Sequence, residues 1–137
     1  MRAVFADTFY WVALTHPDDS RYRDALALDD IVARTTILTT DEILTEFMTF
    51  FSADPGLRSR AATTVRSLLV DPAIRVIPQS RTSFLAGLEL YAERPDKGYS
   101  LVDCISMQTM RQEGLTDVLT NDRHFEQEGF RALFRDS

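Results

Sequence analysis

Short apolar or β-branched runs alternate along this chain with longer segments in which apolar residues recur at helical spacing. The runs at 2–6, 36–39, 74–77 and 118–120 predict strands, and 131–134 is a candidate fifth strand. This alternation predicts an α/β fold, with a central parallel sheet of four or five strands, right-handed crossovers and helices on both faces.

The helical segments carry start and stop signals. Ser100, followed three residues later by Asp103, forms a variant of the capping box, and Gly114 is suited to end the same helix. Either Thr40 or Asp41 is suited to cap the start of an earlier helix. The predicted helices cover residues 8–14, the segment from caps at 18–20 to about residue 33, the segment from 41 to before Asp54, and residues 57–70, 80–93 and 100–114.

The length and composition suit one domain covering residues 1–137, because 45% of the residues are hydrophobic and nine Phe are ample for a single core. The only cysteine, Cys104, excludes an internal disulfide and a zinc site made of thiolates, so a reducing cytoplasm is expected. Asp7 interrupts the apolar amino terminus, so neither a signal peptide nor a membrane span is expected.

The formal net charge of -6 opposes nonspecific attraction to nucleic acid. However, all the basic residues except one are Arg, which binds phosphate better than Lys does. This bias reflects either phosphate binding or genomic base composition. The arginines that either follow an RNA backbone or lie on a solvated face are Arg21, Arg23, Arg58, Arg60, Arg66, Arg111 and Arg123.

Four carboxylates that are far apart in the sequence fall where a parallel sheet brings side chains to one edge. Asp7 follows the first predicted strand and Asp122 follows the fourth, and open α/β sheets bind ligands at the carboxyl ends of their strands. Glu46 lies in the helix after the second strand, and Asp103 lies in the first turn of a later helix. Since Mg²⁺ prefers carboxylate oxygens, all four are candidate metal ligands and catalytic residues, with Glu46 acting through water.

Each of these positions also has a structural interpretation. Asp103 can serve as the acid of the capping box, and Asp122 can serve as a turn residue. Asp7 is harder to explain in this way, because a carboxylate that ends a buried strand needs a partner and no Lys is near it in the sequence. His124 is either a structural turn residue or a base. The aromatic residues 9–11 either join the core or stack on bases.

Glu42 and Glu46 lie one helical turn apart, and either one can supply the second acid. At 100° per residue, Glu46 lies roughly 40° from the edge of the apolar stripe of this helix, whereas Glu42 lies roughly 80° away. Glu46 is therefore expected to face inward. The residues of the predicted stripe are Ile43, Leu44, Phe47, Phe50 and Phe51.

Four short motifs together resemble the PIN domain family. They are Ala6-Asp7-Thr8, Glu46, Ser100-Leu101-Val102-Asp103 and Thr120-Asn121-Asp122-Arg123-His124-Phe125, and their order and spacing cover nearly the whole chain. A stand-alone PIN domain of this size resembles the toxin of a virulence-associated-protein type toxin–antitoxin pair. The resemblance implies a ribonuclease that depends on Mg²⁺ or Mn²⁺, forms a homodimer and is held inactive by a small antitoxin protein.

Other classes of protein also place acids at this edge of a sheet. An aspartate-based phosphatase resembles Asp-x-Asp, but the second position here is Phe9. A receiver-type phosphoacceptor needs an acidic pair after the first strand and a nearby Lys, whereas the lone Lys97 lies in a polar loop. A non-catalytic PIN-like module, whose acids bind a cation or a partner, is the remaining alternative.

Overall fold

A parallel sheet forms the centre of the molecule in a computed structural model, which describes residues 3–16, 18 and 20–135. The described strands are in the order β3-β2-β1-β4-β5, and all the pairings are parallel. The predicted α/β fold with a parallel sheet is therefore confirmed. The strands are β1 (Ala3–Ala6), β2 (Thr36–Thr40), β3 (Ile74–Ile77), β4 (Asp117–Leu119) and β5 (Arg131–Ala132).

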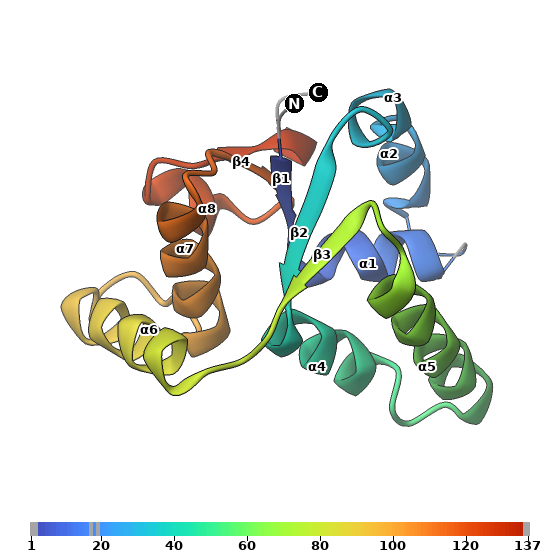
Figure 1. Cartoon of the computed structure of the whole chain (residues 1–137), viewed down its shortest axis with the longest axis horizontal. Coiled ribbons are helices and arrows are strands. Elements are labelled where there is room, and N and C mark those ends of the chain that lie inside the picture. Colours follow the sequence, from blue (N-terminus) through green and yellow to red (C-terminus); the bar gives the residue numbers. More distant parts are fainter. Residues whose placement is uncertain (1–2, 17, 19, 136–137) are drawn as a thin grey trace.

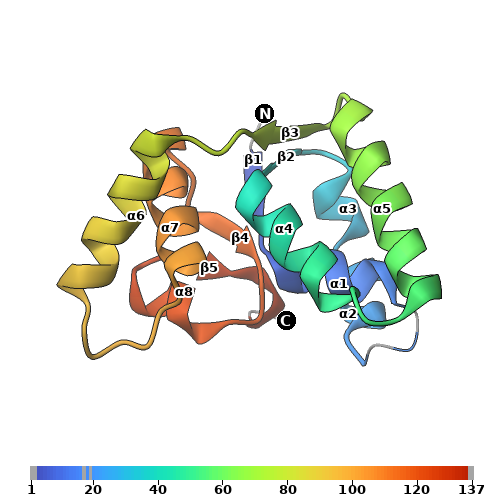
Figure 2. The same ribbon diagram turned by 90° about the horizontal axis from the view of Figure 1, so that it is seen from below.

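Helices flank this sheet on two sides. In Figure 1, α1 to α3 and α5 lie on one side of the sheet, and α6 and α7 lie on the other. Figure 2 shows α4 between these two groups. The helices are α1 (Thr8–Thr15), α2 (Tyr22–Leu26), α3 (Asp29–Val32), α4 (Asp41–Phe50), α5 (Pro55–Val70), α6 (Arg81–Glu93), α7 (Leu101–Glu113) and α8 (Arg123–Gln127). Within the described residues, none of them has the length and apolar character needed to cross a bilayer.

The core lies between the sheet and its helices. The middle strand β1 is buried at Val4, Phe5 and Ala6, as expected for a strand with neighbours on both edges and helices on both faces. Tyr10 and Trp11 are also buried, so these two aromatic side chains belong to the core and are not exposed for base stacking.

Helices α6 and α7 pack closely because Gly87 has no side chain. A Cβ atom added at Gly87 would lie 2.3 Å from Cγ1 of Ile105, so a larger residue would push the helices apart. At the other end of α7, Gly114 ends the helix with a φ of 72°, a conformation that favours glycine.

The predicted helix over residues 20–33 is wrong, because this segment forms the two short helices α2 and α3. The Leu28 N–H donates to the carbonyl of Ala25, only three residues earlier, which tightens the chain and interrupts the α-helical hydrogen-bond pattern. Ala25 and Leu28 are buried, whereas Leu26 and Ile31 are exposed. The segment therefore has too few buried positions to hold one straight helix.

The structure differs from the prediction in the buried stripe of α4 and in the length of the fifth strand. Phe50 is 63% exposed and is not part of the buried stripe of α4, whereas Phe51 follows the end of the helix and turns into the core. The candidate fifth strand stops at Ala132 and continues as a short 3₁₀ helix, Leu133–Arg135. This turn brings Phe134 edge-on against Phe9, with ring centroids 4.9 Å apart.

Candidate metal centre

Asp7 and Thr120 meet at the carboxyl edge of the sheet. Ala6 of β1 lies opposite Leu119 of β4, so the residues that follow them are neighbours. The Thr120 hydroxyl donates a hydrogen bond of 2.8 Å to Oδ2 of Asp7 and accepts one of 3.1 Å from the Asp122 N–H. One buried hydroxyl therefore links the segments that carry two of the four acids.

Asp103 is both a capping residue and a member of the acid cluster. Its N–H donates to the Ser100 hydroxyl at 3.0 Å, and its Oδ2 accepts from the Ser100 N–H at 3.1 Å, which completes the predicted capping box. Burial raises the pKa of Asp103, and the negative charge of Asp122 adds to this effect. The capping role and the proposed metal-binding role are thus compatible.

Asp122 caps the short helix α8 and lies beside His124. Its Oδ1 accepts a hydrogen bond of 2.9 Å from the His124 N–H. The imidazole Nδ1 of His124 lies 3.4 Å from Oδ1 of Asp122 and 3.6 Å from Oδ2 of Asp103. Among the described residues, Asp103, Asp122 and His124 form a group of potential metal ligands whose ligand atoms lie within 4.8 Å of one another.

Glu46 reaches the same end of the sheet from α4. The hydroxyl of Thr8, the residue after Asp7, donates a hydrogen bond of 2.7 Å to Oε1 of Glu46. Thr8, Glu42 and Glu46 line a groove of about 520 Å³. The structure thus places Glu46 next to the Asp7 segment, while Glu42 lies further along the same groove without a described contact to that segment.

The electrostatics tie the four acids together. The pKa of Asp7 is raised to about 7, mainly by burial and in part by the negative charges of Asp103 and Glu46, while the hydrogen bond from Thr120 opposes this change. Asp103 in turn feels the charge of Asp122. The charges of Glu46, Asp103 and Asp122 therefore each act on a neighbouring acid. A buried Asp7 beside three half-buried carboxylates is a set of mutually repelling oxygen donors that fits a hard divalent cation.

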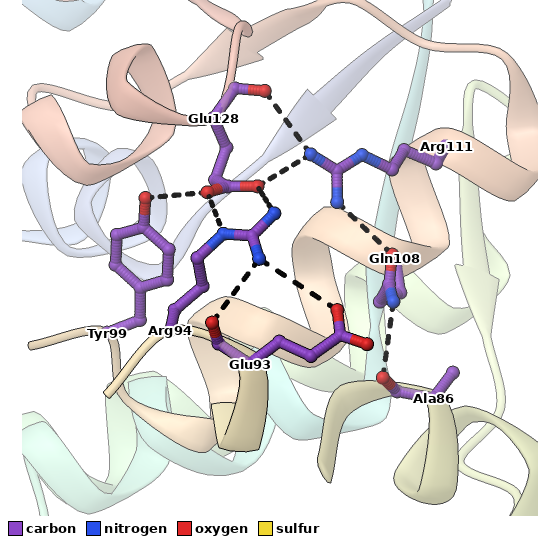
Figure 3. Close-up of polar contacts among 7 residues, drawn as sticks. All are labelled: Ala86, Glu93, Arg94, Tyr99, Gln108, Arg111 and Glu128. Carbon is purple, nitrogen blue, oxygen red and sulfur yellow. Dashed lines mark hydrogen bonds and ion pairs between the residues drawn. The ribbon is translucent and has the colours of Figure 1, made fainter. Parts of the chain in front are cut away.

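A second polar cluster is centred on Glu128 (Figure 3). Glu128, whose side chain is only 5% exposed, accepts hydrogen bonds from Arg94 Nε at 2.8 Å, Arg111 Nη2 at 2.7 Å and the Tyr99 hydroxyl at 3.0 Å. Burial favours the protonated form of Glu128, but these hydrogen bonds outweigh it and lower the pKa to about 2. Sequence patterns did not identify this cluster, because its members come from distant segments.

Tyr99 connects the Glu128 cluster to the acids. It directly precedes the helix cap Ser100, and its ring packs edge-on against the His124 ring, with centroids 5.2 Å apart. Because the Tyr99 hydroxyl is also bonded to Glu128, this residue joins the start of α7 to the segment that contains α8. These are the segments that carry Asp103 and Asp122.

The arginines differ in their distance from this centre. Arg21 lies beside it: with the Asn121 amide oriented so that its oxygen faces Arg21, that oxygen accepts hydrogen bonds of 3.3 and 3.2 Å from the guanidinium. Arg123 adjoins Asp122 and is exposed. Arg58 and Arg60, in contrast, each donate to a backbone carbonyl of a neighbouring segment.

A parallel sheet with acids near its carboxyl edge is consistent with several classes of protein, and comparison with known families identifies which one this is. The model of the PIN domain matches residues 4–130, which is most of the chain. The chain therefore belongs to the PIN domain family, as the motifs in the sequence indicated.

The chain is also similar to individual proteins of known activity. The chain is 26% identical over 127 residues to the 23S rRNA-specific endonuclease VapC20 from two Mycobacterium tuberculosis strains, and the match covers 93% of this chain and 95% of that protein. The crystal structure of Mycobacterium tuberculosis VapC20, a Sarcin-Ricin loop cleaving toxin, matches with a TM-score of 0.82 at 25% identity over 93% of this chain and 95% of that one.

Two more distant structures share the fold. VapBC2 from Rickettsia felis, bound to a DNA fragment from its promoter, matches with a TM-score of 0.68 at 17% identity over 95% of this chain and 96% of that one. FitAcB from Neisseria gonorrhoeae matches with a TM-score of 0.63 at 17% identity over 94% of this chain and 95% of that one.

Proposed function

We propose that this protein is a metal-dependent endoribonuclease and the toxin of a toxin–antitoxin pair, acting in the cytoplasm. The observation that carries the proposal is the convergence of Asp7, Glu46, Asp103 and Asp122 at one edge of the sheet. The similarity to a 23S rRNA-specific endonuclease over nearly the whole chain supports the same reaction class. It also makes ribosomal RNA the first substrate to test.

Asp7, Asp103 and Asp122 hold the cation, which is Mg²⁺ or, in its place, Mn²⁺, and Glu46 acts through a water molecule. When bound, the cation activates water and stabilises charge on the phosphoryl and leaving oxygens. The protein contributes by positioning its acids. Thr120 orients Asp7 and the Asp122 backbone, and Thr8 orients Glu46.

The residue at position 9 argues against an aspartate-based phosphatase. An aspartate-based phosphatase of the Asp-x-Asp type needs its second acid two residues after the first. Here Phe9 occupies that position and packs against Phe134. Hydrolysis of RNA by a metal-activated water is therefore the better proposal.

Cleavage assays with purified protein test this proposal directly. RNA should be cut in the presence of Mg²⁺ or Mn²⁺, and cleavage should stop when EDTA is added. The products should carry 5′-phosphate and 3′-hydroxyl ends, because water and not the ribose 2′-hydroxyl is the nucleophile. Cyclic phosphate ends, or full activity in the chelator, would contradict the mechanism.

The toxin role also predicts a protein partner, together with a homodimer. Several large apolar side chains are exposed and suited to burial against other proteins. We expect a small antitoxin, encoded beside this chain, to make the complex more soluble than the free toxin. Static light scattering of both samples measures this difference, and equal behaviour would count against an obligate antitoxin. The exposed side chains include Phe50, Phe84, Leu85, Leu88 and Tyr91.

A further inference from the structure

His124 places an unsatisfied nitrogen atom among the acids. Its Nδ1 is buried and makes no hydrogen bond to any described residue, although it lies 3.4 Å from one Asp122 oxygen and 3.6 Å from one Asp103 oxygen. Buried polar atoms without a partner are rare in folded proteins, so this one requires an explanation. A protonated imidazole would be satisfied by ion pairs with these two acids, and a neutral imidazole would be satisfied by a bound cation.

We propose that His124 is a direct ligand of the metal ion, so that the centre combines one imidazole nitrogen with carboxylate oxygens and favours Mn²⁺ over Mg²⁺. This inference rests on the metal-dependent activity proposed above. It adds a ligand of a different chemical type to the four acids.

The atoms around Nδ1 explain why a cation suits this position. The two nearest carboxylate oxygens already accept backbone hydrogen bonds, Asp122 Oδ1 from His124 and Asp103 Oδ2 from Ser100. The neutral imidazole that binds a metal presents a lone pair. When Nδ1 carries the lone pair, the three electron-pair donors repel one another, and a divalent cation would remove that repulsion.

The spacing of the three groups is close to that of metal ligands. Neighbouring ligands of an octahedral ion with bonds of about 2.1 Å lie about 3.0 Å apart, and opposite ligands lie about 4.2 Å apart. The nitrogen-to-oxygen distances of 3.4 and 3.6 Å lie between these values, and the whole group fits within 4.8 Å. Small side-chain movements therefore bring all three ligands into one coordination sphere.

The imidazole ring is held in place before any metal binds. The Tyr99 ring packs edge-on against it, and the Tyr99 hydroxyl is bonded to Glu128. Outer contacts that orient a ligating histidine are a regular feature of metal sites. The Glu128 cluster in Figure 3 thus supplies a rigid support for the proposed ligand.

A nitrogen ligand changes the metal preference. Mg²⁺ binds carboxylates and water and gives up its waters reluctantly, whereas transition metals accept imidazole more readily. Mn²⁺ tolerates a mixed set of oxygen and nitrogen ligands. An aspartate-only centre would not discriminate in this way.

Pulsed electron paramagnetic resonance of Mn²⁺ bound to the untagged, purified chain tests the assignment without relying on activity. His124 and His16 are the only histidines. We expect nitrogen modulation of the Mn²⁺ signal that changes when the protein is labelled with ¹⁵N-histidine. His124→Asn should remove the modulation, and the matched control His16→Asn should retain it, because His16 lies at the far end of α1 beside Phe51.

Metal titrations complete the experiment. His124→Asn should weaken Mn²⁺ binding at least about tenfold and Mg²⁺ binding less. If Mn²⁺ binds and is lost in Asp103→Asn but shows no histidine modulation, the His124 assignment is overturned while the proposed nuclease centre stands. If no saturable Mn²⁺ site exists, both are overturned. Should His124→Asn fail to fold, the ¹⁵N-labelled wild-type protein decides alone.

Discussion

The Thr120 hydroxyl forms hydrogen bonds with two of the acid residues. It donates to Asp7 and accepts from the backbone of Asp122, and it is fully buried. A buried carboxylate that loses such a donor also loses part of the stabilisation of its charged form. The geometry of the centre therefore depends on a residue that has no charge of its own.

We predict that Thr120→Val lowers the free energy of unfolding by about 1–2 kcal/mol and reduces the cleavage rate at least about tenfold. Valine keeps the branched shape but has no hydroxyl, so packing is largely preserved. Thr120→Ser is the matched control and should stay near wild type in both respects. Urea unfolding and turnover on one RNA at saturating Mg²⁺ measure the two effects, and an active Val variant would contradict the proposed positioning role.

Substitution of Asp7 should affect catalytic activity and stability in opposite directions. Its pKa is raised from 3.8 to about 7, mainly by burial, so its contribution to stability is fully present below about pH 3.8 and is lost as the pH rises through about 7. Asn carries no such penalty. In the presence of chelator, the free energy of unfolding of Asp7→Asn relative to wild type should therefore increase as the pH rises from 4 to 8. The increase should be on the order of 4 kcal/mol at most.

Urea unfolding of metal-free Asp7→Asn and wild type at both pH values measures this difference. The variant should have lost cleavage activity. A variant that is less stable than wild type at pH 8 would mean that Asp7 serves the fold and not the reaction. Asp103→Asn should likewise lose activity without unfolding.

At the level of secondary-structure elements, the orientation of helix α4 determines which of its two glutamates, Glu42 or Glu46, faces the acid cluster. The predicted apolar stripe included Phe50, which is exposed, yet the expectation that Glu46 faces inward is supported by its hydrogen bond from Thr8. The buried residues Ile43, Leu44 and Phe47 define the face correctly because they repeat at helical spacing.

We predict that Glu46→Gln lowers the cleavage rate at least about tenfold, a loss on the order of 1.4 kcal/mol of transition-state stabilisation. Glu42→Gln, one turn earlier on the same helix, is the matched control and should remain near wild type. Turnover on one RNA at saturating metal compares the two variants. The reverse ranking would assign the second acid to Glu42.

Local capping signals explain why several elements were predictable. Thr40 accepts a hydrogen bond from the Ile43 N–H, as one of the two predicted caps of α4. Ser80 caps α6, and Ser100 begins α7 with the predicted capping box. Each cap joins residues within one turn of helix, so the sequence alone contains the necessary information.

At the scale of the whole molecule, Glu128 connects segments that are far apart in the chain. Arg94 is 34 residues away and Arg111 is 17 residues away. Since the pKa of Glu128 is lowered from 4.5 to about 2, its contribution to stability is present above about pH 4.5 and is lost as the pH falls towards 2.

We predict that Glu128→Gln lowers the free energy of unfolding at pH 7 by about 2 kcal/mol, and that this difference from wild type shrinks as the pH falls from 4.5 to 2. Glu126→Gln is the control, because its ion pair with Arg135 is exposed and should contribute less than about 1 kcal/mol. Urea unfolding across this pH range tests both. A difference that does not depend on pH would mean that packing, and not charge, explains the role of Glu128.

The sequence by itself determined the alternation of strands and helices and the caps of α4, α6 and α7, and it predicted the four acids as candidate site residues. These features depend on the residue types and their spacing over a few positions. The same local patterns were less reliable at residues 20–33 and at Phe50, where burial depends on neighbours from other segments.

Only the tertiary structure decided which of these groups meet. The strand order places β1 between β2 and β4, and the register of that pairing brings Thr120 to Asp7 across 113 residues. It also places the His124 nitrogen between two acids and assembles the Glu128 cluster. Such contacts follow from strand order and helix packing, which a periodic pattern of apolar residues does not specify.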